Sequence, residues 1–195
     1  MTIKLKTPIS EEEIRKLHIG DTVLLSGVIV TARDQAHKLM IEERPDFIRK
    51  YLKESVIYHC GPVVRQNPDG TWKFVAAGPT TSAREEPYQA DVIKEYQVRG
   101  VIGKGGMGPK TLEGLQKYGA VYFHAVGGAG TLIANAVKRV IDVFKLEEFG
   151  TPEAFWVIEV EDFPLVVTMD SHGNSMHKEI LEKSKAVAEE LMGLK

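Results

Sequence analysis

The sequence predicts a mixed α/β domain, and three observations lead to this fold class. Runs of β-branched apolar residues alternate with segments whose apolar residues recur at helical spacing. The middle of the chain repeats the order strand, helix, strand, helix, which requires parallel strands joined by right-handed crossovers. The 195 residues, 43% of them hydrophobic, suffice for a buried core, and no linker interrupts them. We therefore expect one domain over residues 1–195, with a mixed sheet and flanking helices.

Three helices and a strand are expected in the first quarter of the chain. Ser10 stands three residues before Glu13, a spacing that fits a capping box and predicts a short helix. The β-branched run at 22–32 predicts a strand that delivers Arg33 to the start of a helix. A further helical stretch begins near Pro45.

The next part of the chain reads as a hairpin followed by a helix. The apolar runs at 55–64 and 71–78 flank the turn sequence at 67–70, so the two runs are expected to pair. Residues 85–97 carry acidic side chains in the first turn and an early proline, which favours a helix.

The second half alternates strands and helices. The expected elements are a short strand and glycine loop at 99–108, a helix at 109–119, a strand at 120–126, a long helix at 127–144, two strands within 154–170 interrupted at 162–164, and a turn with a terminal helix at 171–195.

Composition excludes several classes of protein. A formal net charge of -2 leaves no broad basic surface for non-specific nucleic-acid binding. The sequence has no signal-peptide pattern and no apolar run near the roughly 20 residues that span a bilayer, so we expect a soluble, cytoplasmic protein without membrane contact. One cysteine, Cys60, excludes an internal disulfide and does not supply the thiolates of an iron–sulfur or structural zinc site. Cys60 itself is expected to be a buried, small apolar residue.

Four polar loops share a predicted position beyond the carboxyl ends of strands, where α/β sheets bind ligands. Together they present two arginines, a lysine, hydroxyls and free backbone N–H groups, which suit a small di- or tricarboxylate or a phosphate. The loops are 31–37 with Arg33, Asp34 and His37; 78–84 with Thr80, Thr81, Ser82 and Arg84; 103–108 with Lys104; and 169–175 with Asp170, His172 and Asn174.

Each of these loops also has a purely structural interpretation. Ser82 and Glu85 match the capping pattern, so loop 78–84 by itself reads as a helix N-terminus. Arg84 and Arg33 are then misplaced, because a cation at a helix start opposes the helix dipole. A bound anion explains both arginines, and surface arginines with solvated head groups are the alternative.

Two glycine-rich segments resemble nucleotide loops only superficially. The loop at 103–108 lacks the Walker spacing and has no hydroxyl after its lysine, and the segment at 125–136 carries Ile133 at the third glycine position. We therefore expect neither nucleotide nor NAD binding. The histidines show no metal-ligand spacing, so no metal site is predicted.

Six segments, taken in order, resemble one protein family. They resemble the β subunit, or C-terminal domain, of class I iron–sulfur fumarate hydratases and the related L-tartrate dehydratases, and the resemblance runs from about Gly20 to about Asn174. The segments are 26–37, 58–64, 76–84, 100–108, 120–130 and 167–175.

The resemblance implies a swivelling β/β/α fold and an active site shared with a partner. This partner would be an α subunit holding a [4Fe–4S] cluster, whose open iron acts as a Lewis acid on the substrate hydroxyl, in an assembly of two α and two β chains. The present chain would bind no cofactor alone and would be inactive alone.

The resemblance also implies residue roles. Arg33, Arg84 and Lys104 would bind the substrate carboxylates, and Thr80, next to Arg84, would be the catalytic base. Thr81 is the alternative base, and the supporting residues would be Asp34, Asp170 and Asn174.

The implied reaction is that of a hydro-lyase, the reversible hydration of fumarate to L-malate. The alternatives are dehydration of L-tartrate to oxaloacetate and, from another class, a dicarboxylate-binding module without catalysis. The sequence does not separate fumarate from tartrate, because the two substrates have the same length.

Overall fold

A computed structural model describes residues 2–193, and its main feature is a seven-stranded sheet in the order β1-β2-β3-β6-β7-β9-β8. The predicted mixed α/β fold, with a mixed sheet and flanking helices, is thereby confirmed. The strands of this sheet are β1 (Thr2–Lys6), β2 (Thr22–Thr31), β3 (Val56–Tyr58), β6 (Gly100–Gly103), β7 (Val121–His124), β8 (Val137–Phe144) and β9 (Phe155–Met169). The helices are α1 (Glu11–Ile14), α2 (Asp34–Glu42), α3 (Asp46–Leu52), α4 (Glu86–Tyr96), α5 (Pro109–Tyr118), α6 (Gly130–Ala134), α7 (Leu146–Phe149) and α8 (Met176–Leu191).

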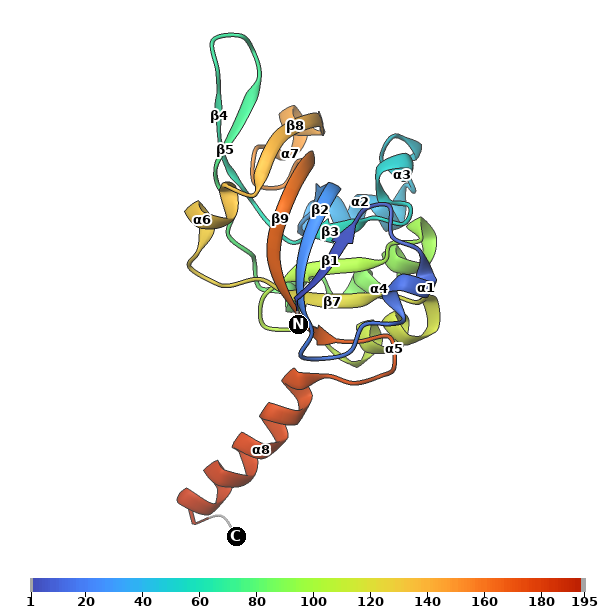
Figure 1. The fold of residues 1–195 in the computed structure, drawn as a ribbon, viewed down its shortest axis with the longest axis vertical. Coiled ribbons are helices and arrows are strands. Elements are labelled where there is room, and N and C mark those ends of the chain that lie inside the picture. The colour runs from blue at the N-terminus through green and yellow to red at the C-terminus, as the bar shows by residue number, and fades with distance from the viewer. Residues whose placement is uncertain (1, 194–195) are drawn as a thin grey trace.

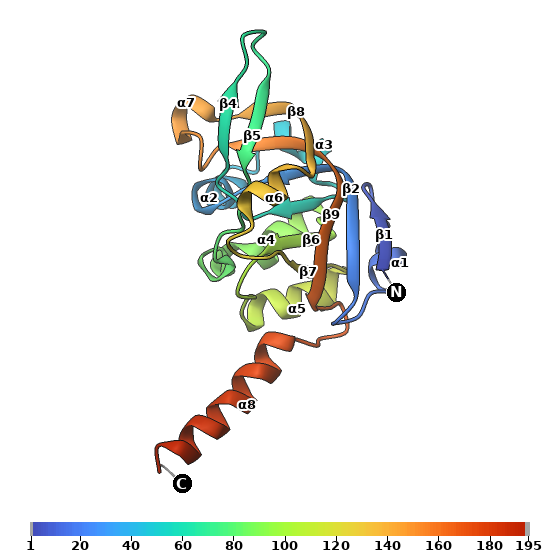
Figure 2. The same ribbon diagram turned by 60° about the vertical axis from the view of Figure 1, so that its left-hand side comes forward.

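In the seven-stranded sheet, β1, β2, β3, β6 and β7 run parallel to one another, and β9 runs antiparallel to them. Neighbours in the series β1, β2, β3, β6, β7 pair in parallel, as the strand–helix alternation predicts. β9 pairs antiparallel with β7, β8 and β2. Because β9 contacts both β2 and β7, the sheet curls back on itself between these strands, and Figure 2 shows the long curve of β9.

Two apolar clusters fill the two sides of the curved sheet. One contains aromatic residues of strands β3, β7 and β9, among them Tyr58, Phe123 and Trp156, all fully buried. The other joins the sheet to the covering helices through residues such as Ile48 of α3 and Ile93 of α4. Fully burying one such aliphatic side chain contributes about 1.5–3 kcal/mol, so the helices are held mainly by these contacts.

Two segments stand away from the body. The hairpin of β4 (Val63–Gln66) and β5 (Trp72–Ala76) projects at one end, and α8 projects at the other (Figure 1). α8 has no buried residue, so its helical form rests on its N-cap, where the Ser175 hydroxyl accepts from the Lys178 N–H, and on local pairs. No helix among residues 2–193 is long and apolar enough to cross a membrane.

Several local predictions are confirmed. Ser10 and Glu13 form the reciprocal capping box of α1. The hairpin forms from the second part of the run at 55–64, while the first part becomes β3 in the main sheet. The helix at 109–119 ends with Gly119 in the left-handed conformation that glycine adopts at low cost.

Three predictions of secondary structure are wrong or incomplete. The long helix at 127–144 is the short helix α6 followed by strand β8, since the β-branched residues Val137, Val140 and Val143 pair with β9. The two strands within 154–170 are the single strand β9, which absorbs the expected break through Asp162 at φ +48°. Strand β1 is not predicted by the sequence analysis, and it forms an edge beside β2.

Candidate active site

Three of the four polar loops meet at one edge of the sheet. Arg33 follows β2, Lys104 follows β6, and the loop of residues 77–85 follows β5. Backbone hydrogen bonds fix this loop across the strand ends. The Thr80 N–H donates to the His59 carbonyl at 2.7 Å, the Lys104 N–H donates to the Thr80 carbonyl at 3.2 Å, and the Ser82 N–H donates to the Lys104 carbonyl at 3.1 Å.

The three predicted cations differ in whether a carboxylate pairs with their charge. Arg33 Nε lies 3.4 Å from the Glu153 carboxylate, and Arg84 pairs with Asp34. Lys104 has no ion pair with any residue in the described part of the chain. This edge therefore offers a bound anion one free ammonium and two guanidiniums whose present partners are carboxylates.

A glycine makes room for Arg33. A Cβ at Gly61 would lie 2.7 Å from Nη1 of Arg33 and 3.0 Å from the Pro152 carbonyl oxygen. Both distances are too short for ordinary packing, so a larger residue at this position would displace the guanidinium.

The two threonines of the loop are in different surroundings. The Oγ1 atom of Thr80 is buried and has no hydrogen-bond partner among residues 2–193, whereas Thr81 is exposed. Leaving a buried hydroxyl unpaired costs free energy, about 1–3 kcal/mol, and such atoms in native proteins call for an explanation. A ligand that supplies the missing partner is one such explanation.

The predicted capping role of Ser82 is wrong. Ser82 opens a short 3₁₀ turn (Ser82–Arg84), and α4 then begins after Glu85 without a side-chain cap. The Ser82 hydroxyl points inward instead, 2.8 Å from Nδ1 of His59 and 2.9 Å from the Tyr122 hydroxyl. A Cβ at Gly103 would lie 1.8 Å from Ser82 Oγ, so only glycine admits this hydroxyl.

A buried layer of polar side chains supports the loop from below. Gln89 Oε1 accepts a hydrogen bond from Nε2 of His59 at 2.8 Å and lies 2.9 Å from Nε2 of His37, whose Nδ1 donates to the Arg33 carbonyl at 2.9 Å. Burial lowers the pKa of His37, and burial together with the neighbouring His37 holds the pKa of His59 well below its ordinary value. Both imidazoles are therefore neutral, and His59 accepts the proton of Ser82 at Nδ1.

Two carboxyl groups lie beside this layer. Burial, followed by the interaction with Asp34, raises the pKa of the fully buried Glu85 to about 8. Burial also acts to raise the pKa of Asp34, but the hydrogen bond with Glu85 and the charge of Arg84 lower it overall. At neutral pH the pair thus carries one charge, located on Asp34 next to Arg84.

The glycine loop after Lys104 is anchored by Glu86. Its carboxylate accepts from the Gly108 N–H at 2.7 Å and from the hydroxyl and N–H of Thr111 at 2.6 and 3.2 Å. These bonds satisfy backbone groups at the start of α5, so the loop that carries Lys104 is held by the first turn of α4.

The fourth polar loop lies elsewhere, which corrects the expected placement of Asp170 and Asn174. Because β9 is antiparallel to β7, residue Met169 pairs with Tyr122 near the start of β7, away from its carboxyl end. Asp170 accepts from the backbone N–H groups of Ile19, His172 and Asn174 and from the Asn174 amide. The Asp170 carboxylate is thereby fully satisfied, while the buried Ser171 hydroxyl of the same loop has no hydrogen-bond partner among residues 2–193.

The sequence analysis misses Glu85, Gln89, His59 and Tyr122 as parts of this site. For Gln89 a signal exists, since it occupies the apolar face of α4 together with Ala90, Val92, Ile93 and Tyr96. A polar residue at a core position indicates a buried partner. For Glu85, His59 and Tyr122, no local sequence pattern indicates that they lie close together.

The chain offers little to a metal ion. Among residues 2–193 no group of three or more His, Cys, Asp or Glu side chains has a metal-binding arrangement. Cys60 is buried, as predicted, and burial raises the pKa of its thiol to about 12. It is therefore a packing residue.

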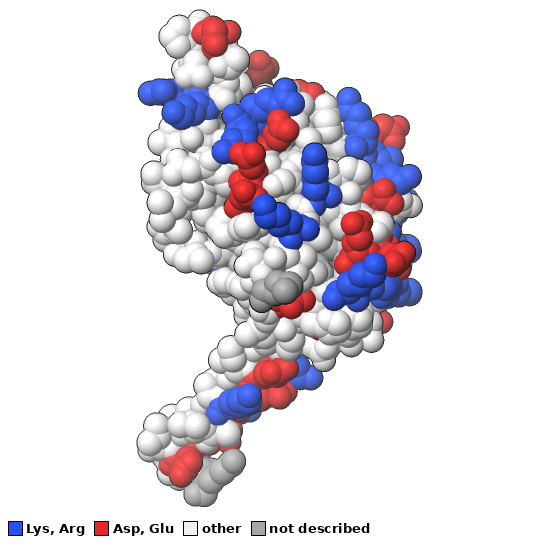
Figure 3. Space-filling view, viewed as in Figure 1, with Lys and Arg blue, Asp and Glu red and all other residues white. Residues whose placement is uncertain are grey.

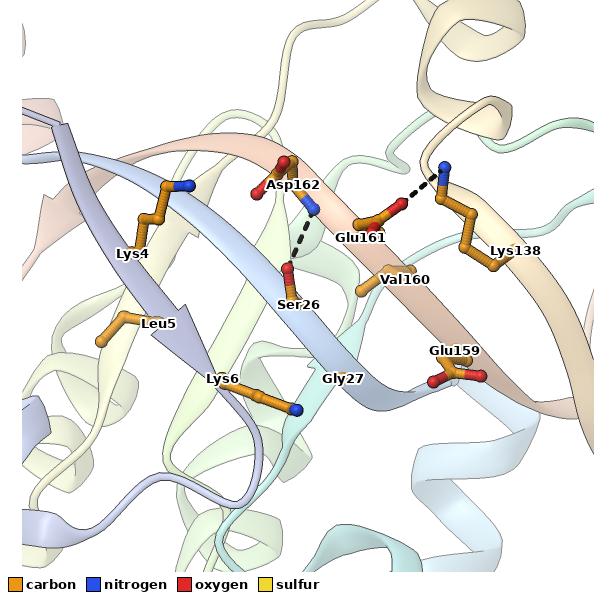
Figure 4. Close-up of a pocket in the computed structure, with 10 residues that line it drawn as sticks. All are labelled: Lys4, Leu5, Lys6, Ser26, Gly27, Lys138, Glu159, Val160, Glu161 and Asp162. Atoms are coloured by element: carbon orange, nitrogen blue, oxygen red, sulfur yellow. Dashed lines mark hydrogen bonds and ion pairs between the residues drawn. The ribbon is translucent and has the colours of Figure 1, made fainter.

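Of the other hollows of the surface, one of about 720 Å³ is lined by Ala83 and Gly105, the neighbours of Arg84 and Lys104, and by residues of α8, whereas the next lies away from the three cations. One groove of about 590 Å³ runs over β1, β2, β8 and β9, where three lysines face three carboxylates and the Asp162 N–H donates to Ser26 (Figure 4). Figure 3 shows basic and acidic side chains interleaved on this face. The groove has no excess of one charge, in contrast to the edge that holds Arg33, Arg84 and Lys104.

Comparison with known proteins identifies the family of the chain. The family model described as "Fumarase C-terminus" matches residues 1–180. The chain is 50% identical over 182 residues to a putative class I fumarate hydratase of Geobacillus stearothermophilus, covering 93% of this chain and 34% of that protein. It is 44% identical to a putative L(+)-tartrate dehydratase subunit beta of Methanocaldococcus jannaschii, covering 95% of this chain and 96% of that one.

A third relative extends the comparison. The L(+)-tartrate dehydratase subunit beta of Escherichia coli K12 is 42% identical, over 95% of this chain and 90% of that subunit. The chain thus spans about a third of the fumarate hydratase, at 34%, and nearly all of the two beta subunits. On the match of residues 1–180 and these identities, the chain belongs to the fumarase C-terminus family.

Proposed function

We propose that this chain, acting as one domain, is the β subunit of a two-subunit hydro-lyase that reversibly hydrates fumarate to L-malate. The observation that carries the proposal is the meeting of Arg33, Arg84 and Lys104 around the buried, unpartnered hydroxyl of Thr80. Cations fit the two carboxylates of such a substrate, and a hydroxyl without a partner is available for a proton of the substrate.

The cations have a chemical purpose beyond binding. Removing a proton from the carbon next to a carboxylate builds further negative charge on that group, so fixed cations stabilise the transition state more than the ground state. A charge pair near 4 Å at an effective dielectric of about 20 contributes roughly 4 kcal/mol. Only the increase of this interaction during the reaction accelerates it.

Thr80 would take the carbon-bound proton. A threonine hydroxyl is a weak base, so it needs neighbours that stabilise its ionised form. Arg84 and Lys104 are the cations on its own loop and on the segment bonded to it, through the Lys104 N–H and the Thr80 carbonyl. Thr81 fits the role less well because its side chain is exposed.

The proposal includes a partner that carries a [4Fe–4S] cluster. The two relatives of matching length are named as beta subunits, which supports a separate α chain, and we propose two copies of each chain in the cytoplasm. Cys60, the one cysteine, is buried and does not fit the ligand set of a cluster. When bound to the α chain, the cluster would supply a Lewis acid for the substrate hydroxyl.

L-tartrate is the second candidate substrate. The relatives that match over nearly their full length are named tartrate dehydratases, whereas the relative of 50% identity is named a fumarate hydratase. Tartrate carries one more hydroxyl than malate, so a site that hydrogen-bonds this hydroxyl would strongly prefer it. Turnover of L-malate and L-tartrate by the same preparation decides between them.

The test uses the chain co-purified anaerobically with its iron–sulfur partner. We expect Thr80→Ala to lower kcat by about 10²–10⁴-fold, the usual worth of a general base. Thr80→Ser keeps a hydroxyl and is expected to retain most activity. Thr81→Ala is the matched control on the adjacent, exposed residue, with little expected effect.

Two outcomes would contradict the proposal. Unchanged turnover in Thr80→Ala would remove Thr80 from the mechanism, and a larger loss in Thr81→Ala would assign the base to Thr81. Tight binding of dicarboxylates by the isolated chain, with no iron–sulfur partner and no turnover, would favour a binding module.

A further inference from the structure

Three carboxylate oxygens behind Arg84 are buried without a hydrogen-bond donor. They are Oδ1 of Asp34 and both oxygens of Glu85, whose side chain is completely buried. Ionised carboxylates only accept hydrogen bonds, and burying one without a donor is costly. Two ionised groups in contact at this place would add mutual repulsion to that cost.

Among residues 2–193, no side chain donates a hydrogen bond to the Glu85 carboxyl. On its own segment, Arg84 is committed to Asp34 of α2. His59, after β3, lies 3.9 Å from Glu85 Oε2, but its Nδ1 accepts from Ser82 and its Nε2 faces Gln89. Tyr122 of β7 is hydrogen-bonded with Ser82. One proton on the pair of carboxyl groups removes this lack of a donor, because a protonated carboxyl group can donate a hydrogen bond to the other carboxylate.

We propose that Glu85 is protonated in the substrate-free protein and donates a hydrogen bond to the ionised Asp34, and that this acid pair positions Arg84 for a substrate carboxylate. Glu85 is then a positioning residue, which acts through Asp34 and Arg84. The proposal deepens the proposed function and rests on it for the identity of the anion, while the acid pair itself rests on the buried, unpartnered carboxyl oxygens and on the interaction between Asp34 and Glu85.

The pair also sets the charge of the site. With Glu85 protonated, the pair carries one negative charge, which Arg84 offsets. Ionisation of Glu85 would place a second negative charge behind the cations and weaken dicarboxylate binding. The pKa of Glu85 is raised to about 8 by burial and then by Asp34, so this loss falls in the mildly alkaline range.

The first experiment compares pH profiles of the two-subunit enzyme. If binding requires the protonated acid, KM for the dicarboxylate rises about tenfold from pH 7 to pH 9 for a group of pKa near 8. Glu85→Gln keeps a donor toward Asp34 and does not ionise, so its KM should stay flat over this range. Glu42→Gln, the same change at the end of α2, is the control and should keep the wild-type profile.

A third variant separates positioning from packing. Glu85→Met fills a similar volume without a donor, so its KM should be raised already at pH 7, whereas kcat per folded enzyme changes less. A KM that still rises between pH 7 and pH 9 in Glu85→Gln, as in wild type, would overturn the proposal.

The second experiment needs no activity. In the full chain labelled with ¹³C at the side-chain carboxyls of Glu, the Glu85 signal, assigned by its loss in Glu85→Gln, should titrate near pH 8. A titration near the ordinary value of about 4.3 would overturn the acid pair. Absence of turnover with every dicarboxylate would instead contradict the proposed function, and the titration would still decide the protonation of Glu85.

Discussion

The loop that carries Thr80 and the loop that carries Asp170 look alike in sequence and differ in structure. Both follow a strand and both are rich in hydroxyl, amide and charged groups. The Asp170 loop satisfies its own carboxylate with three backbone N–H groups and one amide. The Thr80 loop leaves the Thr80 hydroxyl unpartnered beside the cations. The Ser171 hydroxyl of the Asp170 loop is also buried without a partner among residues 2–193, so the Thr80 loop is distinguished by the arginine it carries and by its backbone hydrogen bonds to Lys104.

The largest expected effect is at Arg84. Arg84→Ala should lower kcat/KM by about 10³-fold, since the lost charge contact stabilises the transition state by roughly 4 kcal/mol. The guanidinium is exposed and pairs only with Asp34 among the described residues, so the thermal midpoint should change little. Steady-state kinetics and a melting curve check both parts. If Arg84→Ala lost stability but kept the wild-type kcat/KM, the Thr80 loop would have a structural role and the assignment of the site to it would be wrong.

Asp170→Ala should show the opposite result, a large loss of stability with little change in turnover. It leaves three backbone N–H groups without their acceptor and should lower the free energy of unfolding by about 3 kcal/mol. Turnover per folded molecule should remain within twofold of wild type. Urea unfolding measures the first quantity. A tenfold loss of turnover in fully folded enzyme would return Asp170 to the active site.

The two loops should also respond to pH with opposite signs. Hydrogen bonds from Asn174, His172 and Ile19 outweigh the effect of burial and lower the pKa of Asp170. Its contribution to stability is therefore present above its unfolded pKa and lost as the pH falls through the lower folded pKa. Glu85 has a raised pKa, about 8, so its contribution is full below its unfolded pKa and lost as the pH rises toward 8.

Unfolding free energies across pH measure this difference. Between pH 5 and pH 8 the wild-type chain should lose about 3–4 kcal/mol that Glu85→Gln does not lose. Below pH 4, Asp170→Ala should show a weaker loss of stability than wild type. Parallel curves for wild type and Glu85→Gln would show that Glu85 ionises normally in the folded protein.

Asn174→Ala should have the smallest effect. Asn174 is exposed, and its amide donates one hydrogen bond to Asp170 at 2.9 Å while the backbone N–H bond to Asp170 remains. We expect a loss of about 1 kcal/mol in unfolding free energy and unchanged turnover. A larger effect on turnover than on stability would contradict the structural assignment of this loop.

Local signals predicted much of the fold. The capping box of Ser10 and Glu13, the hairpin turn and the parallel strand order follow from neighbours in sequence, because caps, turns and crossovers depend on a few adjacent residues. The helix expected at 127–144 fails for a related reason. Its apolar spacing is compatible with a helix, and only the pairing of β8 with β9 decides for a strand.

The candidate site was predictable in part. The cations Arg33, Arg84 and Lys104 could be identified from the sequence because they follow predicted strands or stand at helix starts, where a positive charge is otherwise unfavourable. Glu85, His59 and Tyr122 give no such signal, since their properties arise from burial and from one another.

By itself, the sequence determined the fold class, the family resemblance and the residue types available for anion binding, because periodicity, glycine positions and local charge are written along the chain. The tertiary structure alone decided which loops share an edge of the sheet. The antiparallel direction of β9 carries Asp170 away from that edge, while the parallel β2 and β6 bring Arg33 and Lys104 to it. The direction of β9 follows from its pairing with β2 and β7, whose residues are far apart from it in sequence, and no local pattern specifies that pairing.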